Sequence, residues 1–263
     1  MFTPEDREAL RTELIEAARA DPRITGAAIT GSGSVGNEDR WSDIDLAFGV
    51  RDASEVESTL ADFGERMYRD HHALHHVDVP SGAWIYRVFL LPSTLQVDLA
   101  FAPATDFRAR ASTFRLVFGT AAEESYVVHA TAEQLIGYAW LYALHVRSSI
   151  ARGKPWQAEY MIGEMRNHVL QLACLRYGLT TREARGTDRL PADVTRPLQD
   201  ALVRSLDTEE LLRAFRTTTS GLIREMRSVD EELTNRLEQT VRGLTEIPAD
   251  ALPLASRAAE RAG

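Results

Sequence analysis

The sequence predicts an α+β fold, in which a mixed sheet in the first half of the chain is followed by a helical bundle in the second. Apolar segments of strand length alternate with helical patterns through residue 128, whereas helical periodicity dominates from residue 129 onward. The segment Thr131-Ala132-Glu133-Gln134 has the form of a capping box and marks the change. The 263 residues are 44% hydrophobic and 26% charged, which fits an ordinary globular core. We therefore expect two domains, residues 1–128 and 129–263.

The first half opens with a helix and continues with strands. Thr3 is a typical N-cap residue, Pro4 suits the first helical position, and apolar residues follow at helical spacing until Asp21-Pro22. Apolar runs then predict strands at residues 24–30, 43–50, 84–91, 95–101 and 114–118, with a helix at 55–68. These strands are enough to form a mixed sheet.

A cluster of histidines, His71, His72, His75 and His76, lies between this helix and the strand at 84–91. Their spacing would allow zinc binding if the segment were helical. No cysteine accompanies them, so a surface or lid segment is the favoured interpretation.

The second half is predicted to be nearly all helix. A helix at residues 131–151 stops at Arg152-Gly153, and Pro155 opens the next one, which Gly178 ends. Further helices are expected at 208–226 and 230–244. The Ala- and Arg-rich segment from Pro248 onward is expected to be loosely held.

Two carboxylates on one face of a predicted strand give the first indication of chemistry. Successive side chains of a strand point to opposite faces, so Asp43 and Asp45 share one face while Ile44 and Leu46 share the other. Two like charges this close repel each other unless a cation neutralises them. Ligands that are all oxygen suit a hard ion such as Mg²⁺.

A glycine- and serine-rich segment directly follows the first strand. Gly31, Ser32, Gly33 and Gly36 lie there, and glycine lets a backbone turn sharply and approach a ligand closely. The N–H groups of a short helix at this point would favour phosphate. A phosphate cradle beside a Mg²⁺-binding carboxylate pair is what phosphoryl or nucleotidyl transfer needs.

Together these residues resemble the nucleotidyltransferase superfamily that includes DNA polymerase beta, whose signature is Gly-Ser, a spacer, and then Asp-x-Asp. Gly31-Ser32 and Asp43-Ile44-Asp45 stand in this register. The family carries a third carboxylate on a later strand, and Asp98 in the strand at 95–101 supplies it. The resemblance covers roughly the first half of the chain and implies a nucleotidyltransferase domain there.

The resemblance also implies a role for each residue. Asp43 and Asp45 would hold two Mg²⁺ ions, and Asp98 would bind the ion that activates the acceptor hydroxyl. Gly31 and Ser32 would hold phosphates of an NTP, with ATP as the expected co-substrate. Superfamily members that modify small molecules also have a helical second half, which helps to form the acceptor pocket.

Two residues of the second half are further candidates. Lys154 lies at a helix junction where related small-molecule enzymes often place a lysine that binds the triphosphate; a solvated lysine near a helix end is the alternative. Glu159 could bind the acceptor or be an ordinary solvated position. In some kanamycin-modifying relatives a glutamate just before the lysine is the general base, but Ile150 stands four residues before Lys154. The general base therefore stays open, with Asp98 as one alternative.

The expected reaction is transfer of a nucleoside monophosphate to a hydroxyl of a small molecule, with release of pyrophosphate. Aminoglycoside and lincosamide nucleotidyltransferases are the closest functional analogues. The alternatives are nucleotidylation of a protein partner, as in antitoxin-type enzymes, and a non-catalytic nucleotide-sensing module.

Composition bounds the partners. The net charge is −9 and the pI about 5.3, whereas proteins that bind nucleic acid usually carry a basic face, so no nucleic-acid partner is expected. No apolar run is long enough to cross a bilayer, and the N-terminus lacks the apolar region of a signal peptide, so a cytoplasmic protein is expected. Cys174 is the single cysteine, which excludes an intrachain disulfide. Both a monomer and a homodimer remain open.

Overall fold

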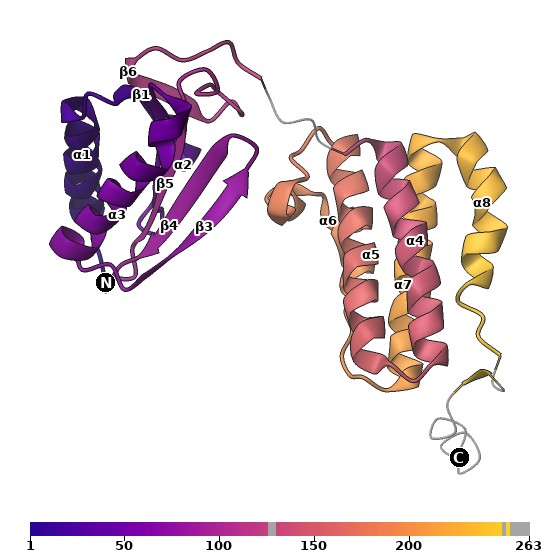
Figure 1. Cartoon of the computed structure of the whole chain (residues 1–263). Coiled ribbons are helices and arrows are strands. Elements are labelled where there is room, and N and C mark those ends of the chain that lie inside the picture. Colours follow the sequence, from indigo (N-terminus) through magenta and orange to yellow (C-terminus); the bar gives the residue numbers. More distant parts are fainter. Residues whose placement is uncertain (126–129, 249–250, 253–263) are drawn as a thin grey trace. The chain divides into compact units, whose positions relative to one another are not determined.

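The computed structural model describes residues 1–125, 130–248 and 251–252, and the chain divides into two compact units, Met1–Val128 and His129–Gly263 (Figure 1). The first unit contains a six-stranded mixed sheet with helices, and the second is helical. The fold is therefore α+β, a mixed sheet followed by a helical region, as predicted.

The first unit begins with helix α1 (Pro4–Ala20), whose N-cap Thr3 forms a capping box with Asp6. The remaining elements are β1 (Ile24–Thr30), α2 (Gly31–Ser34), β2 (Ile44–Val50), a 3₁₀ turn (Ala53–Glu55), α3 (Val56–His71), β3 (His75–Ser81), β4 (Trp84–Leu90), β5 (Gln96–Pro103) and β6 (Phe114–Gly119). All five predicted strands are confirmed.

The strands lie in the order β3-β4-β5-β2-β1-β6. Strands β2 and β5 pair in parallel, and the other neighbours are antiparallel. Helices α1 and α3 cover one face of this sheet, where the side chains of Phe48, Phe63 and Phe101 pack together. The opposite face carries small residues, among them Ala47 and Ala100, under Phe107. Helices therefore bury one face of the sheet, and Phe107 covers part of the other.

The histidine-rich segment lies largely at the surface, where His72 and His75 are exposed, and it is divided between a helix end and a strand. His71 ends helix α3, and His72 caps that helix in the left-handed region with φ 56°. His75 and His76 begin β3, which pairs with β4 along its whole length. Sequence periodicity missed this strand because it lies at the sheet edge and is exposed on nearly every residue.

The second unit consists of α4 (Ala132–Ala151), α5 (Pro155–Arg176), α6 (Ala192–Gln199), α7 (Thr208–Val229) and α8 (Glu231–Gly243), with 3₁₀ turns at Arg182–Ala184 and Thr187–Arg189. The four long helices were predicted, whereas α6 was not. Their shared core includes Ile162, Met165, Phe215 and Leu222. The segment from Pro248 onward was expected to be loosely held. Most of it, residues 249–250 and 253–263, lies outside the described residues. Within the described ranges, no helix has the length and apolarity to cross a bilayer.

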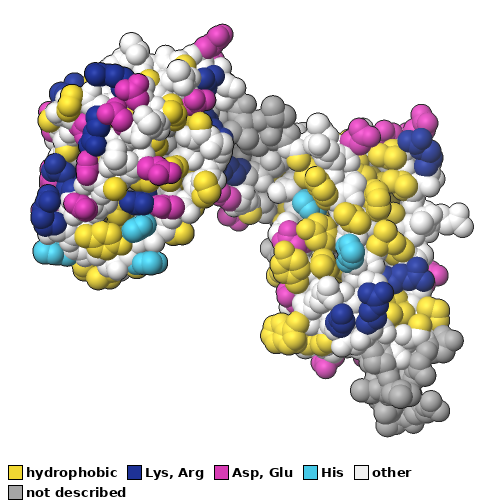
Figure 2. All heavy atoms as spheres, in the orientation of Figure 1, with side chains coloured by type: hydrophobic (Ala, Val, Ile, Leu, Met, Phe, Trp, Pro, Cys, Tyr) yellow, Lys and Arg dark blue, Asp and Glu magenta, His cyan; other side chains and the backbone are white. Residues whose placement is uncertain are grey.

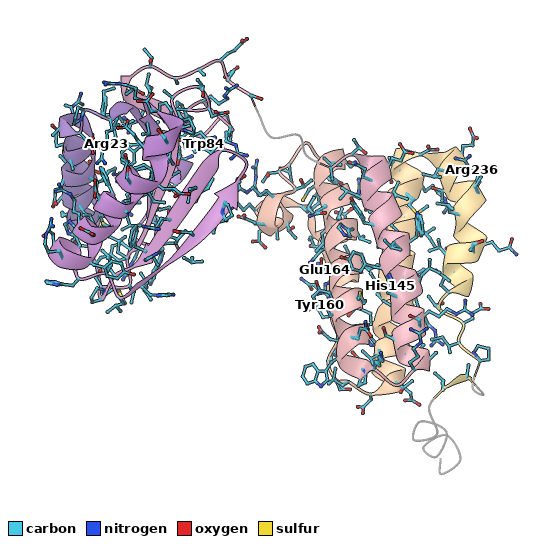
Figure 3. The ribbon with its side chains drawn as sticks, in the orientation of Figure 1. Arg23, Trp84, His145, Tyr160, Glu164 and Arg236 are labelled. Carbon is cyan, nitrogen blue, oxygen red and sulfur yellow. The ribbon has the colours of Figure 1, made fainter. Side chains whose placement is uncertain are left out.

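The outer surface of this unit has one distinct feature. Hydrophobic side chains gather over α4 and α5 on the face seen in Figure 2, with two histidines among them. Tyr138 and Tyr142 of α4 pack against the ring of His168 on α5, with ring centroids 5.5 and 5.4 Å away. Figure 3 labels Tyr160 and Glu164 on α5 and His145 on α4 in the same region.

Candidate active site

Three carboxylates meet at the centre of the sheet. Asp43 immediately precedes β2, Asp45 is its second residue, and Asp98 lies on β5. The parallel register places Asp45 directly beside Asp98. One carboxylate oxygen from each of the three half-buried residues lies within 4.8 Å of the others. The structure thus brings together the three acids that the sequence indicated.

Asp43 and Asp98 have no basic side chain paired with them among the described residues. The pKa of Asp98 is raised to about 6, chiefly because the carboxyl is buried; the hydrogen bond from Gln96 lowers this pKa, and the charge of the nearby Asp43 carboxylate raises it. A bound cation would supply the missing counter-charge.

Gln96 joins two members of the triad. Its Nε2 atom donates to Asp43 Oδ2 at 3.2 Å and to Asp98 Oδ1 at 3.0 Å. The sequence analysis assigned Gln96 no role, because a glutamine at the start of a strand carries no signal of its own. By donating to both carboxylates, the amide bridges two negative charges that otherwise repel each other.

The donor set fits a hard divalent cation. Three carboxylates converge from adjacent strands, and no sulfur or imidazole ligand accompanies them. Mg²⁺ prefers a small number of carboxylates and keeps water or substrate phosphate at its other positions. Among the described residues, the triad is the one place where three or more His, Cys, Asp or Glu side chains lie close enough to share a metal ion. The histidines of α3 and β3 do not form such a group.

The glycine-rich loop lies directly against the triad. Gly31 has φ +60°, and a Cβ atom there would lie 1.9 Å from Asp45 Oδ2. The hydroxyl of Ser34 donates to the Gly31 carbonyl at 2.8 Å, and the Asn37 N–H donates to the Ser32 carbonyl at 3.1 Å. Only glycine fits at position 31, because the loop backbone and the Asp45 carboxylate are in contact.

Two buried arginines hold the segment that leads to Asp43. The guanidinium of Arg7, 5% exposed, donates from Nη1 to the carbonyls of Asp39 at 2.6 Å and Ser42 at 3.0 Å. Arg11, 4% exposed, forms two hydrogen bonds with Glu38 at 3.0 and 3.1 Å. Helix α1 therefore fixes the connection between the glycine loop and β2. Sequence reasoning missed both residues, because arginine is seldom buried.

Lys154 and Glu159 belong to the second unit, whereas the triad and the glycine loop belong to the first. Lys154 is the exposed N-cap residue of α5, after Gly153 with φ +64°. Glu159 is half-buried in the first turns of that helix. Burial lowers the pKa of Arg166 on the same helix, and the charge of Glu159 opposes this shift.

Comparisons with known proteins find likeness in structure but not in sequence. No protein-family model matches the sequence, and no curated protein matches it. One solved structure that matches is an aminoglycoside 6-adenyltransferase from Bacillus subtilis, with a TM-score of 0.41 and 16% sequence identity. The match covers 93% of this chain and 99% of that one.

Proposed function

We propose that this protein is a Mg²⁺-dependent nucleotidyltransferase. It transfers a nucleoside monophosphate from an NTP, with ATP as the expected donor, to a hydroxyl of a small molecule, and pyrophosphate is released. The observation that carries the proposal is the meeting of Asp43, Asp45 and Asp98 within 4.8 Å, with the backbone of Gly31 packed on Asp45. A phosphate-binding loop and an acidic triad in contact are the parts that this reaction needs.

Each group has a defined task. Gly31 and Ser32 present the loop backbone to the NTP phosphates, and the three aspartates hold two Mg²⁺ ions. When bound, Mg²⁺ lowers the pKa of the acceptor hydroxyl and neutralises the charge that develops on the leaving pyrophosphate. The acceptor hydroxyl would give its proton to a base, for which Asp98 is one candidate, and its oxygen would form a bond to the α-phosphorus while the bond from the α-phosphorus to the bridging oxygen breaks and pyrophosphate leaves.

Two further roles come from the resemblance alone and fall on residues of the second unit. Lys154 binds the triphosphate, since a lysine ammonium is a compact charge suited to phosphate oxygens. Glu159 binds the acceptor, for which aminoglycoside and lincosamide antibiotics are the first compounds to try. The acceptor is a small molecule rather than a nucleic acid, in keeping with a net charge of −9.

Pyrophosphate release tests the proposal. The protein is incubated with Mg²⁺, each of the four NTPs in turn, and a panel of aminoglycosides, lincosamides and other hydroxyl compounds; the variant Asp43→Asn/Asp45→Asn is the control. Release that requires one acceptor, one nucleotide and both aspartates is the expected result. Equal release by the control would refute the catalytic role of the triad. Nucleotide binding without release for any acceptor would favour a protein acceptor or a sensor.

A further inference from the structure

The sheet face that carries the triad continues beyond Asp98 onto the β3–β4 hairpin. Residues paired across neighbouring strands share a face. Asp98 of β5 pairs with Val88 of β4, which pairs with Val77 of β3. The adjacent rows are Ala100, Tyr86 and Val79 on one side and Gln96, Leu90 and His75 on the other. We name Val77, Val79, Tyr86, Val88 and Leu90 the hairpin strip.

The hairpin strip is apolar and accessible. Val77 is 54% exposed, Val79 48% and Leu90 49%, while Tyr86 and Val88 are half-buried. Exposed apolar side chains grouped in this way commonly mark a binding surface. Asp78 and Arg87 alternate with the strip residues along β3 and β4, so their side chains lie on the opposite face of the hairpin. There they form an ion pair, with Arg87 Nε 2.7 Å from Asp78 Oδ1. Both strands are described in full, and neither places a carboxylate on the face of the strip.

The guanidinium of Arg110 lies at the end of the strip formed by Tyr86 and Val79. Arg110 donates from Nη1 to the hydroxyl of Tyr86 at 3.1 Å and to Ser81 Oγ at 3.2 Å. Its guanidinium also lies over the ring of Trp84, 5.8 Å from the centroid; Figure 3 labels Trp84 on the sheet. The strip therefore begins at the triad and ends at a fixed positive charge, which disfavours a cationic group on a ligand there.

The order of the strands indicates which substrate the strip would meet. The glycine loop leaves the end of β1, on one side of the acidic strands β2 and β5, and the hairpin lies on the other side. In nucleotidyl transfer the attacking hydroxyl and the leaving pyrophosphate lie roughly in line on opposite sides of the phosphorus. With the phosphates at the glycine loop, the acceptor approaches from the side of the hairpin.

We propose that the hairpin strip binds the acceptor, and that the acceptor is a hydroxyl compound with an uncharged, apolar face beside its reactive hydroxyl. This assignment rests on the proposed function, because that function places the acceptor hydroxyl at Asp98. An added peptide strand is a poorer occupant, since β3 is an edge strand whose Pro80 cannot donate a backbone hydrogen bond. A second copy of the chain is the alternative occupant of the strip, and the test must distinguish it from the acceptor.

The test compares two probes that differ only in apolar surface, glucose and hexyl β-D-glucopyranoside. Binding of each probe to the full chain is measured by calorimetry, and adenylyl transfer by pyrophosphate release with Mg²⁺ and ATP. The variant Val77→Ser/Val79→Ser removes exposed apolar side chains without opening the core. The matched control is Val229→Ser at the end of α7, where the valine is 41% exposed. Thermal unfolding verifies that both variants fold.

The expected result is that the hexyl glycoside binds more tightly than glucose, and that the strip variant weakens its binding and lowers kcat/KM about tenfold. Glucose and the Val229→Ser control should show no such loss. Hexyl glycoside binding that is absent, or equal in the strip variant and the wild type, overturns the proposal. A change from dimer to monomer in light scattering of the strip variant also overturns it, because the face would then join two copies. If the hexyl glycoside binds in a way that depends on the strip but no pyrophosphate is released, the strip is a binding surface and the proposed reaction is refuted instead.

Discussion

Replacing Gly31 by alanine tests whether the glycine loop and the triad form one site. A Cβ atom at this position would lie 1.9 Å from Asp45 Oδ2, and contacts of a Cβ atom below 3.0 Å are not tolerated. The carboxylate oxygen must therefore move by about 1 Å, or the loop must move instead. Mg²⁺ requires near-ideal octahedral geometry, and disturbance of the groups around a metal commonly weakens its binding by about 10–100-fold.

Gly36→Ala is the matched control. Gly36 also has a positive φ, +70°, but a Cβ atom there would meet nothing within 4 Å. Both substitutions carry the same backbone cost of about 1–2 kcal/mol for an L-residue in the left-handed region. Only Gly31→Ala adds the contact with Asp45.

Calorimetric titration with Mg²⁺ and thermal unfolding separate the two effects. We expect both variants to lose the stability set by the shared backbone cost, Gly31→Ala to lose more because of the contact with Asp45, and Gly31→Ala alone to bind Mg²⁺ at least about tenfold more weakly. Equal Mg²⁺ affinity in the two variants would show that the loop can move away from Asp45, and the reasoning that joins loop and triad would be wrong.

Three further predictions concern the surroundings of the triad. The pKa of Asp98 is raised from 3.8 to about 6 in the fold, so the free energy of metal-free unfolding should fall by up to roughly 3 kcal/mol as the pH rises from about 4 to about 6, and Mg²⁺ affinity should rise. In denaturant titrations Asp98→Asn should remove this fall, while carboxyls with a lowered pKa, such as Glu210, still contribute at lower pH. Gln96→Leu removes the hydrogen bond that lowers this pKa, so the midpoint of Mg²⁺ affinity against pH should move upward, and an unchanged midpoint would exclude the role of the amide. Arg7→Met leaves the carbonyls of Asp39 and Ser42 without their donor, so we expect the free energy of unfolding in denaturant titrations to fall by about 2–4 kcal/mol. A fall of less than about 0.5 kcal/mol would show that Arg7 does not stabilise this segment.

The sequence predicted the triad because its signal is local. Asp43 and Asp45 are separated by one residue, so strand alternation alone places them on one face. Asp98 was found through a family resemblance, and the parallel register then explains its position beside Asp45. Gly31 was predicted to approach a ligand, and its contact with Asp45 gives a structural reason for the glycine.

What the sequence did not predict depends on contacts between distant residues. Strand β3 has no buried residue, and its apolar alternation is confined to Val77 and Val79 on either side of Asp78, too short to indicate a strand by itself. Arg7 and Arg11 look like surface residues of an amphipathic helix, and only the folded loop at Glu38 shows why they are buried. Helix α6 contains Pro197 within eight residues, which argues against a helix in any local scheme.

The parallel pairing of β2 with β5 makes the acidic site a property of the native state alone. Asp45 and Asp98 lie far apart in the chain, with α3 and the β3–β4 hairpin between them, and they meet only when the two strands have paired. An unfolded chain therefore has no comparable binding site. A cation that binds only the folded form shifts the folding equilibrium by mass action. Under the proposed function, the free Mg²⁺ concentration of the surroundings becomes one of the quantities that determine how much of the first unit is folded.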